Sequence, residues 1–273
     1  MRKLILVLCV LGVFAVNAQK SQLTNAKVLV YTKNGPGFIH DNIPFAVASI
    51  QKLGHEKHFT VEVSDNPSVF SPENLKQYRL LIFTSTNNDV FDTDAQRLAF
   101  RRYMESGGGF VGIHSVTGTE RNWSWFKMMV GETFTWHAKF QPFRIISIDP
   151  AHPSLKGVPT KWEKEDECYF GKELYPGIKT LMMHDVRSLD VAQQELITKH
   201  SGVFGPYFPA VWTQKFQGGH VWVTTLGHAK DNYSEATFVN HIYQGIDFIA
   251  NQVHGLDESK AFAASRDDAL RFP

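Results

Sequence analysis

Histidines follow three of the strands that the sequence predicts. His40 comes after the apolar run 27–31 and its Gly-rich loop, His114 ends the run 110–113, and His228 follows the run 220–225. In open parallel sheets, ligands bind at the carboxyl ends of the strands, where loops converge and helix N-termini point. We therefore expect the three imidazoles to meet at one edge. A lone histidine is more often structural, but three at one edge favour a functional site.

His114 occupies the most informative of these positions. The segment 109–115 runs through a buried strand into a sharp turn, which resembles the turn that exposes the nucleophile of a nucleophile elbow. Imidazole at such a tip suits proton transfer or metal ligation better than stable acyl chemistry. A structural interpretation also fits, in which Gly107–Gly109 end a helix and His114 caps a strand.

Adjacent acids and aromatic side chains could complete the site. Asp166 and Glu167 could move a second proton or complete a metal shell, although neighbouring acids usually form a solvated loop. The predicted catalytic residues are His114, Glu167, Asp166 and His40, and the predicted substrate-binding residues are Trp136, Tyr169 and Ser115.

A divalent metal such as zinc is a second possibility at this edge. A catalytic zinc takes about three protein ligands, commonly histidine with a carboxylate. The predicted ligands are His114, His137 and His228, but no short histidine spacing fixes the metal. No nucleotide cofactor is predicted.

The elements that must position these residues alternate between strand and helix. Apolar runs predict strands at 27–31, 59–63, 79–83, 110–113, 143–148 and 180–183, and a hairpin at 210–214 and 220–225. Helices are expected over 40–53 with Gly54 as the stop, from 71–73, over 94–105 and over 235–251. Such alternation with short connections predicts an α/β fold with a mostly parallel sheet and helices on both faces.

The ends of the chain differ from this central region. Residues 1–18 have a basic start, an apolar run and small residues before a cleavage position, as a signal peptide does. The alternative is an uncleaved anchor, which the short apolar run disfavours. Residues 19–26 are expected to be a linker, 27–252 a single domain, and 253–273 a polar tail.

Charge and cysteine content exclude several classes of function. Loss of Arg2 and Lys3 with the signal peptide leaves 26 basic and 27 acidic residues. The sequence has no basic stripe, so nucleic-acid binding is not expected. The sequence also lacks an amphipathic basic helix of the kind that binds membrane surfaces, so membrane binding is not expected after cleavage. Only Cys168 would remain, so the mature chain can form no internal disulfide.

The chain resembles the ThuA-like (trehalose utilisation) family of the class I glutamine-amidotransferase-like superfamily. The matching segments are 37–41, 107–115, 131–137, 166–169, 209–212 and 218–228. The resemblance implies a flavodoxin-like three-layer sandwich and a link to bacterial sugar utilisation, often beside oxidoreductases that make or use keto-sugars. Amidotransferases of the superfamily carry a nucleophilic cysteine where this chain has His114, so glutaminase activity is not expected. His220 stands where a basic residue such as arginine is expected, which puts an anion contact there in doubt.

Two functions from different classes remain open. The first is an exported, periplasmic enzyme that acts on a glycoside or keto-sugar by proton transfer, with Trp123, Trp125 and Trp136 available for stacking or core packing. The second is a non-catalytic carbohydrate-binding or accessory protein of a sugar-utilisation system. A hydrolase that pairs Glu167 with a second carboxylate is a third possibility. The sequence leaves the sugar and the oligomeric state open.

Overall fold

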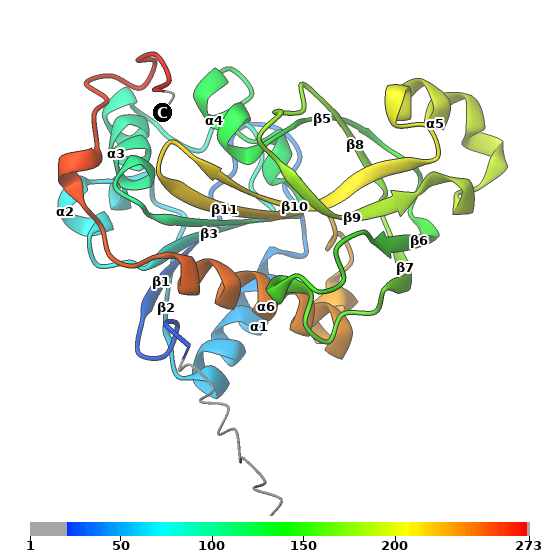
Figure 1. Ribbon diagram of the computed structural model, residues 1–273, viewed down its shortest axis with the longest axis horizontal. Helices are drawn as coiled ribbons and strands as arrows, with labels where there is room; N and C mark the ends of the chain where they lie inside the picture. Colours follow the sequence, from blue (N-terminus) through cyan, green and yellow to red (C-terminus); the bar gives the residue numbers. More distant parts are fainter. Residues whose placement is uncertain (1–20, 272–273) are drawn as a thin grey trace, which may run out of the picture.

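The computed structural model describes residues 21–271, so the predicted signal peptide lies outside the described residues. Nine strands form one sheet in the order β2-β1-β3-β4-β11-β10-β9-β6-β7 (Figure 1). The parallel part consists of β1 Lys27–Tyr31, β2 Thr60–Ser64, β3 Leu80–Thr84, β4 Gly109–Ile113 and β11 Gly219–Thr224. The antiparallel part consists of β6 Gln141–Ser147, β7 Lys161–Asp166, β9 Lys179–Asp185 and β10 Tyr207–Phe216. A separate ribbon pairs β5 Thr133–His137 with β8 Tyr169–Lys172.

Helices cover both faces of the sheet and make two hydrophobic cores (Figure 1). The core on one face is built with α1 Ile43–Lys57 and α6 Ala236–Gln252, and α5 Gln194–Ser201 adds Ile197 to it. The other core is built with α2 Pro72–Leu75, α3 Asp94–Glu105 and α4 Ser124–Val130. The predicted α/β three-layer sandwich is confirmed.

Most predicted elements are present, with one instructive difference in α1. The helix begins at Ile43 instead of His40 and continues through Gly54 to Lys57. Gly54 is required inside the helix because a Cβ there would lie 2.7 Å from Val61 and 2.9 Å from the Phe59 carbonyl oxygen. The helix ends instead at His58, whose φ of 61° lies in the left-handed region. Gly54 thus marks a close helix–strand contact rather than a helix end.

The described parts of the expected linker, 21–26, and of the expected tail, 253–271, are both packed against the domain. Leu23 is buried in the core, and the Ser21 hydroxyl pairs with Asp247 of α6. At the other end, the carboxylate of Glu105 accepts hydrogen bonds from the N–H groups of Phe262 and Ala263, each at 3.0 Å. Residues 253–271 therefore form an ordered strap over α3.

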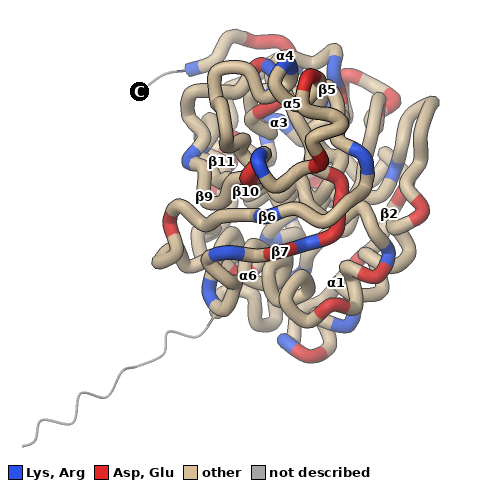
Figure 2. The backbone as a smooth tube through the Cα atoms, turned by 90° about the vertical axis from the view of Figure 1, so that its right-hand side faces the viewer, with Lys and Arg blue, Asp and Glu red and all other residues tan. Residues whose placement is uncertain are grey.

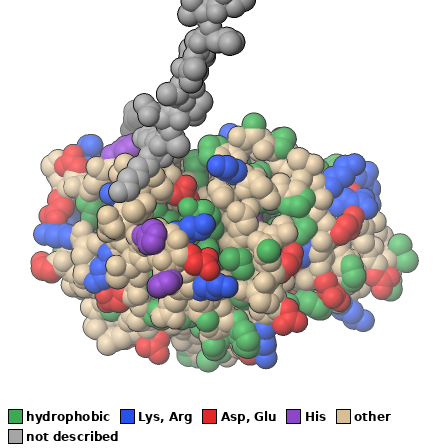
Figure 3. All heavy atoms as spheres, turned by 90° about the horizontal axis from the view of Figure 1, so that it is seen from below, with side chains coloured by type: hydrophobic (Ala, Val, Ile, Leu, Met, Phe, Trp, Pro, Cys, Tyr) green, Lys and Arg blue, Asp and Glu red, His purple; other side chains and the backbone are tan. Residues whose placement is uncertain are grey.

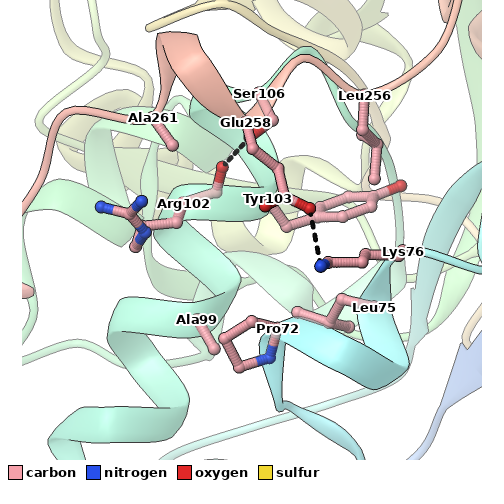
Figure 4. A pocket seen from close by; sticks show the side chains of 10 residues that line it. All are labelled: Pro72, Leu75, Lys76, Ala99, Arg102, Tyr103, Ser106, Leu256, Glu258 and Ala261. Atoms are coloured by element: carbon pink, nitrogen blue, oxygen red, sulfur yellow. Dashed lines mark hydrogen bonds and ion pairs between the residues drawn. The ribbon is translucent and has the colours of Figure 1, made fainter.

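Two fully buried charges explain why this strap is ordered. Arg101 pairs with Glu105 at 2.8 Å, and its guanidinium also donates to the carbonyl oxygens of Arg266 and Asp268. A buried charge is costly unless it is paired and hydrogen-bonded, and the backbone of the strap supplies those partners. Figure 4 shows the small cavity beside these contacts, where Glu258 of the strap reaches Lys76 across Tyr103.

Charged side chains of both signs are interspersed along the chain (Figure 2) and over the face that carries α1 and α6 (Figure 3). Among residues 21–271, no helix has the length and apolar character needed to span a bilayer.

Candidate functional site

His114 lies directly after β4, with no exposed surface, and its ring is held from two sides. Its Nδ1 lies 3.1 Å from the carbonyl oxygen of Thr225, and its Nε2 lies 3.0 Å from the hydroxyl of Tyr169. Because a carbonyl only accepts, Nδ1 carries the proton and Nε2 accepts from the phenol. Burial, together with the nearby His40 and His228, lowers the pKa of His114 well below its usual value. This imidazole is therefore neutral.

The backbone at His114 has the conformation expected of an elbow. Its φ of 59° is left-handed, which costs a non-glycine residue about 1–2 kcal/mol. The following turn, 114–118, is a 3-10 helix, and the Ser85 N–H donates to the Ile113 carbonyl beside it at 3.0 Å. Packing on all sides thus holds a strained residue at the strand end, as is common at functional sites.

His40 and His228 meet His114 at the carboxyl edge of the sheet. The ring centroid of His40 lies 4.7 Å from that of His114 and 5.6 Å from that of His228. His40 is also 3.3 Å from the Ser115 hydroxyl through its Nδ1. Burial, then the charge of His228, lowers the pKa of His40 to about 4. The structure thus brings together the three histidines of the three strand ends.

Glu167 joins this cluster to His137. Its Oε2 lies 3.0 Å from Nδ1 of His228, and its Oε1 lies 3.3 Å from Nδ1 of His137. Burial alone would lower the pKa of His228, but the hydrogen bond and negative charge of Glu167 outweigh it, and the pKa is raised. The site therefore holds a neutral imidazole, His114, next to an imidazole that favours its charged form, His228.

Asp166 lies behind the site rather than in it. The residue is fully buried, and its Oδ1 accepts hydrogen bonds from the N–H groups of Glu167 and His228, each at 2.9 Å. Its Oδ2 accepts from the N–H of Gly227 at 2.8 Å and from the Asn232 amide at 3.1 Å. With its acceptor sites occupied, the carboxylate positions its neighbours and has no free access to a ligand. The structure thus gives Asp166 a different place from the catalytic one that the sequence predicted.

A cavity of about 390 Å³ opens above the cluster. Its lining residues are Phe38, His40, Asn87, Ser115, Gly118, Arg121, Phe134, His137, Glu167, Tyr169 and His228. The volume lies near the small end of the range for ligand pockets, which suits a ligand of one or two sugar rings. Sequence reasoning missed Phe38, Asn87, Arg121 and Phe134, because nothing in their local pattern marks the loops that converge here.

The tryptophans that the sequence offered for sugar stacking or core packing lie outside the cavity. Trp136 stacks on His200 at 4.8 Å between ring centroids, outside the cavity. The β5–β8 ribbon has a register shift between Phe134 and Trp136, so these two residues do not share a face as strict alternation would require. Phe134 consequently lines the cavity. Trp123 and Trp125 are buried in the core built with α3 and α4.

The histidines that could hold a metal differ by one residue from the predicted set. Single nitrogen atoms of His40, His114 and His228 lie within 4.8 Å of one another. His137, predicted as the third ligand, lies on the far side of Glu167 and pairs with that carboxylate instead. Cys168 is fully buried in the core, and burial raises the pKa of its thiol well above the usual value.

We predict that Glu167→Gln lowers the pKa of His228. The substitution removes the negative charge that holds the imidazole in its charged form, while burial continues to oppose charging. NMR titration of the histidine ring protons measures this pKa. Glu163→Gln, which alters an exposed ion pair with Arg144, serves as the control and should leave His228 unchanged. An unaltered His228 pKa in Glu167→Gln would contradict the proposed coupling.

Comparison with known proteins agrees with the fold. The family model described as ThuA, trehalose utilisation, matches residues 27–249. A comparison with curated protein sequences gives no match. Among solved structures, a protein from Bacteroides uniformis described as ThuA-like has a TM-score of 0.70 at 21% identity, covering 88% of this chain and 98% of that one. A protein of the same description from Parabacteroides merdae has a TM-score of 0.61 at 19% identity, covering 83% of this chain and 90% of that one.

The same fold also occurs inside a larger protein. A β-galactosidase from Rahnella sp. R3 matches with a TM-score of 0.53 at 12% identity, over 82% of this chain but only 31% of the enzyme. At this identity the match shows the fold alone. The family model covers most of the chain, and this protein belongs to the ThuA (trehalose utilisation) family and is related to carbohydrate utilisation.

Proposed function

We propose that the protein is an exported carbohydrate-processing enzyme that moves protons on a glycoside or keto-sugar. The observation that carries the proposal is the Glu167 carboxylate, which lies at a sugar-sized cavity between His228 at 3.0 Å and His137 at 3.3 Å. A carboxylate beside an imidazole that favours its charged form provides both a proton acceptor and a proton donor.

In the proposed step, Glu167 removes a proton from the carbon next to the carbonyl group of the sugar. The C–H bond breaks, an O–H bond forms on Glu167, and the electron pair becomes the double bond of an enolate. The charged imidazole of His228 donates a hydrogen bond or its proton to the enolate oxygen. Return of a proton to carbon gives isomerisation or epimerisation, and loss of a neighbouring substituent gives elimination. The step balances without a further reactant.

Neutral side chains around these two groups have positioning roles. Tyr169 donates to Nε2 of His114, and burial, then the charge of Glu167, raises the pKa of its phenol well above the usual value. Tyr169 therefore stays protonated and cannot compete with Glu167 as a base. The rings of Phe134 and Tyr169 lie 4.5 Å apart at their centroids and offer an apolar wall for one face of a sugar.

The same residues fit a divalent metal such as zinc. His40, His114 and His228 would hold the ion, with Glu167 in reach of two of them. Nδ1 of His114 faces the Thr225 carbonyl, which orients the ring as partners of metal-bound histidines do. The lone pair of Nε2, which accepts from the Tyr169 hydroxyl, would turn to the metal instead. A ligand histidine must be neutral, so a bound metal would take the place of the charged His228 imidazole and would supply Lewis-acid polarisation of a sugar carbonyl.

Export is the remaining part of the proposal. The arrangement of residues 1–18 as basic start, apolar run and small residues favours a signal peptide and a periplasmic location.

Glu167→Gln should lower turnover of the substrate about 100-fold or more and change its affinity only a few-fold, because the amide cannot accept the proton. The measurement is product formation by NMR across a panel of glycosides and keto-sugars, with affinities by calorimetry. Glu163→Gln is the matched control. If the wild type binds sugars without turning any over, and Glu167→Gln loses that affinity, the protein is a carbohydrate-binding protein and the enzyme proposal is wrong.

For the metal, elemental analysis of protein purified without a histidine tag should find about one divalent ion per chain. The variant His228→Ala should lose it, because it removes one of three ligands. His200→Ala, which alters an imidazole outside the cavity, should retain it. A metal content that is equal in wild type and His228→Ala would contradict the proposed ligand set, and no metal in the wild type would remove the metal from the proposal.

A further inference from the structure

A second cavity, of about 340 Å³, adjoins the histidine cavity and carries positive charge. The two cavities share Arg121 and Phe134, and the second is lined further by Lys127, Thr133, Thr135, Lys172 and Glu173. Three cations therefore line it against one carboxylate. The two cavities therefore meet at Arg121 and Phe134, with the histidine cluster in one and the excess positive charge in the other.

The single carboxylate of this cavity is already occupied. Glu173 accepts from the Lys127 ammonium and from the Thr133 hydroxyl, each at 3.0 Å. Within residues 21–271, no carboxylate oxygen lies within 4.0 Å of a side-chain nitrogen of Arg121 or Lys172. Among the described residues, Arg121 and Lys172 thus line this cavity without a carboxylate in ion-pair contact.

Arg121 is fixed in place although it is exposed. Its Nε donates to the Gly118 carbonyl at 2.9 Å, its Nη2 donates to Oδ1 of Asn87 at 3.4 Å, and its guanidinium lies 5.6 Å from the Phe134 ring centroid. An exposed arginine normally loses side-chain entropy when it binds a ligand. Here the turn after β4 has already ordered the guanidinium, and Nη1 is left without a partner among the described residues.

The position of Arg121 indicates which part of a ligand it would contact. The Phe134 and Tyr169 rings connect it to His114, with centroid separations of 4.5 Å between the two rings and 4.6 Å from Tyr169 to His114. Arg121 thus contacts the Phe134 ring of this aromatic pair, whereas His114 contacts the Tyr169 ring. It would meet a substituent that extends past Phe134 into the second cavity.

We propose that this second cavity is a subsite for an anionic substituent, so that the ligand is an acidic sugar or a sugar bearing an acidic second unit. The inference rests on the proposed carbohydrate function. Carboxylate, sulfate ester and phosphate ester share the required chemistry, and the planar guanidinium matches the paired oxygens of each.

The test compares the affinity of the full chain for sugars that differ only in charge. The neutral members are methyl glucoside, methyl galactoside and glucose. The anionic partner of methyl glucoside is methyl glucuronide, and that of methyl galactoside is methyl galacturonide. Glucose is compared with both glucose 6-sulfate and glucose 6-phosphate. We expect at least one anionic member to bind about tenfold more tightly than its neutral partner, and the difference to shrink as salt is raised.

Variants of the lining residues test whether this cavity causes the preference for anionic sugars. Arg121→Gln and Lys172→Gln should each reduce it, Arg121→Lys should retain most of it, and Lys161→Gln, an exposed lysine on β7, should leave it unchanged. Equal affinity for neutral and anionic partners, or a preference that survives Arg121→Gln, would overturn the subsite while leaving the carbohydrate function intact. Failure of every neutral and anionic sugar to bind would count against the carbohydrate function itself.

Discussion

The Asp166 carboxylate lies at the end of β7, fully buried beneath the histidines, and four N–H groups converge on it. Two of these belong to the backbone of Glu167 and His228, the pair that makes the proposed proton-transfer unit. A buried carboxylate is tolerated only when its lone pairs are satisfied, so the loop after β11 must stay folded around it. Burial raises the pKa of Asp166, and the charge of Lys164 and the backbone donors oppose that rise. This one group therefore ties the antiparallel part of the sheet to its parallel part at the site.

The consequence is a pair of imidazoles at one sheet edge whose pKa values are shifted in opposite directions. His114 is wedged between the Thr225 carbonyl and the Tyr169 hydroxyl and is neutral, whereas His228 faces Glu167 and favours its charged form. The two pKa values diverge because His114 is fully buried, whereas His228 opens to the cavity and faces the Glu167 carboxylate. Such divergence of environments is what acid–base chemistry near neutral pH requires.

The sequence predicted the parallel core and the convergence of His40, His114 and His228, because apolar strands and strand-end positions leave periodic local signals. It could not predict β7, whose buried face carries Trp162, Lys164 and Asp166, since charged residues there read as a solvated segment. It placed Trp136 in the site because that residue precedes His137, and the register shift in β5 is invisible in the pattern of residue types. It also missed Arg121 and the strap 253–271, whose roles depend on contacts with residues distant in the sequence.

The proposed chemistry is tested most directly by proton exchange with solvent. Keto-sugars are incubated with the protein in deuterated water, and NMR follows deuterium entry at the carbon next to the carbonyl. Our account expects incorporation well above the uncatalysed rate, even where no net product forms, because proton removal by Glu167 precedes any later step. Binding of keto-sugars in the cavity without any enhanced incorporation would contradict proton transfer and identify the histidine cluster as a binding site.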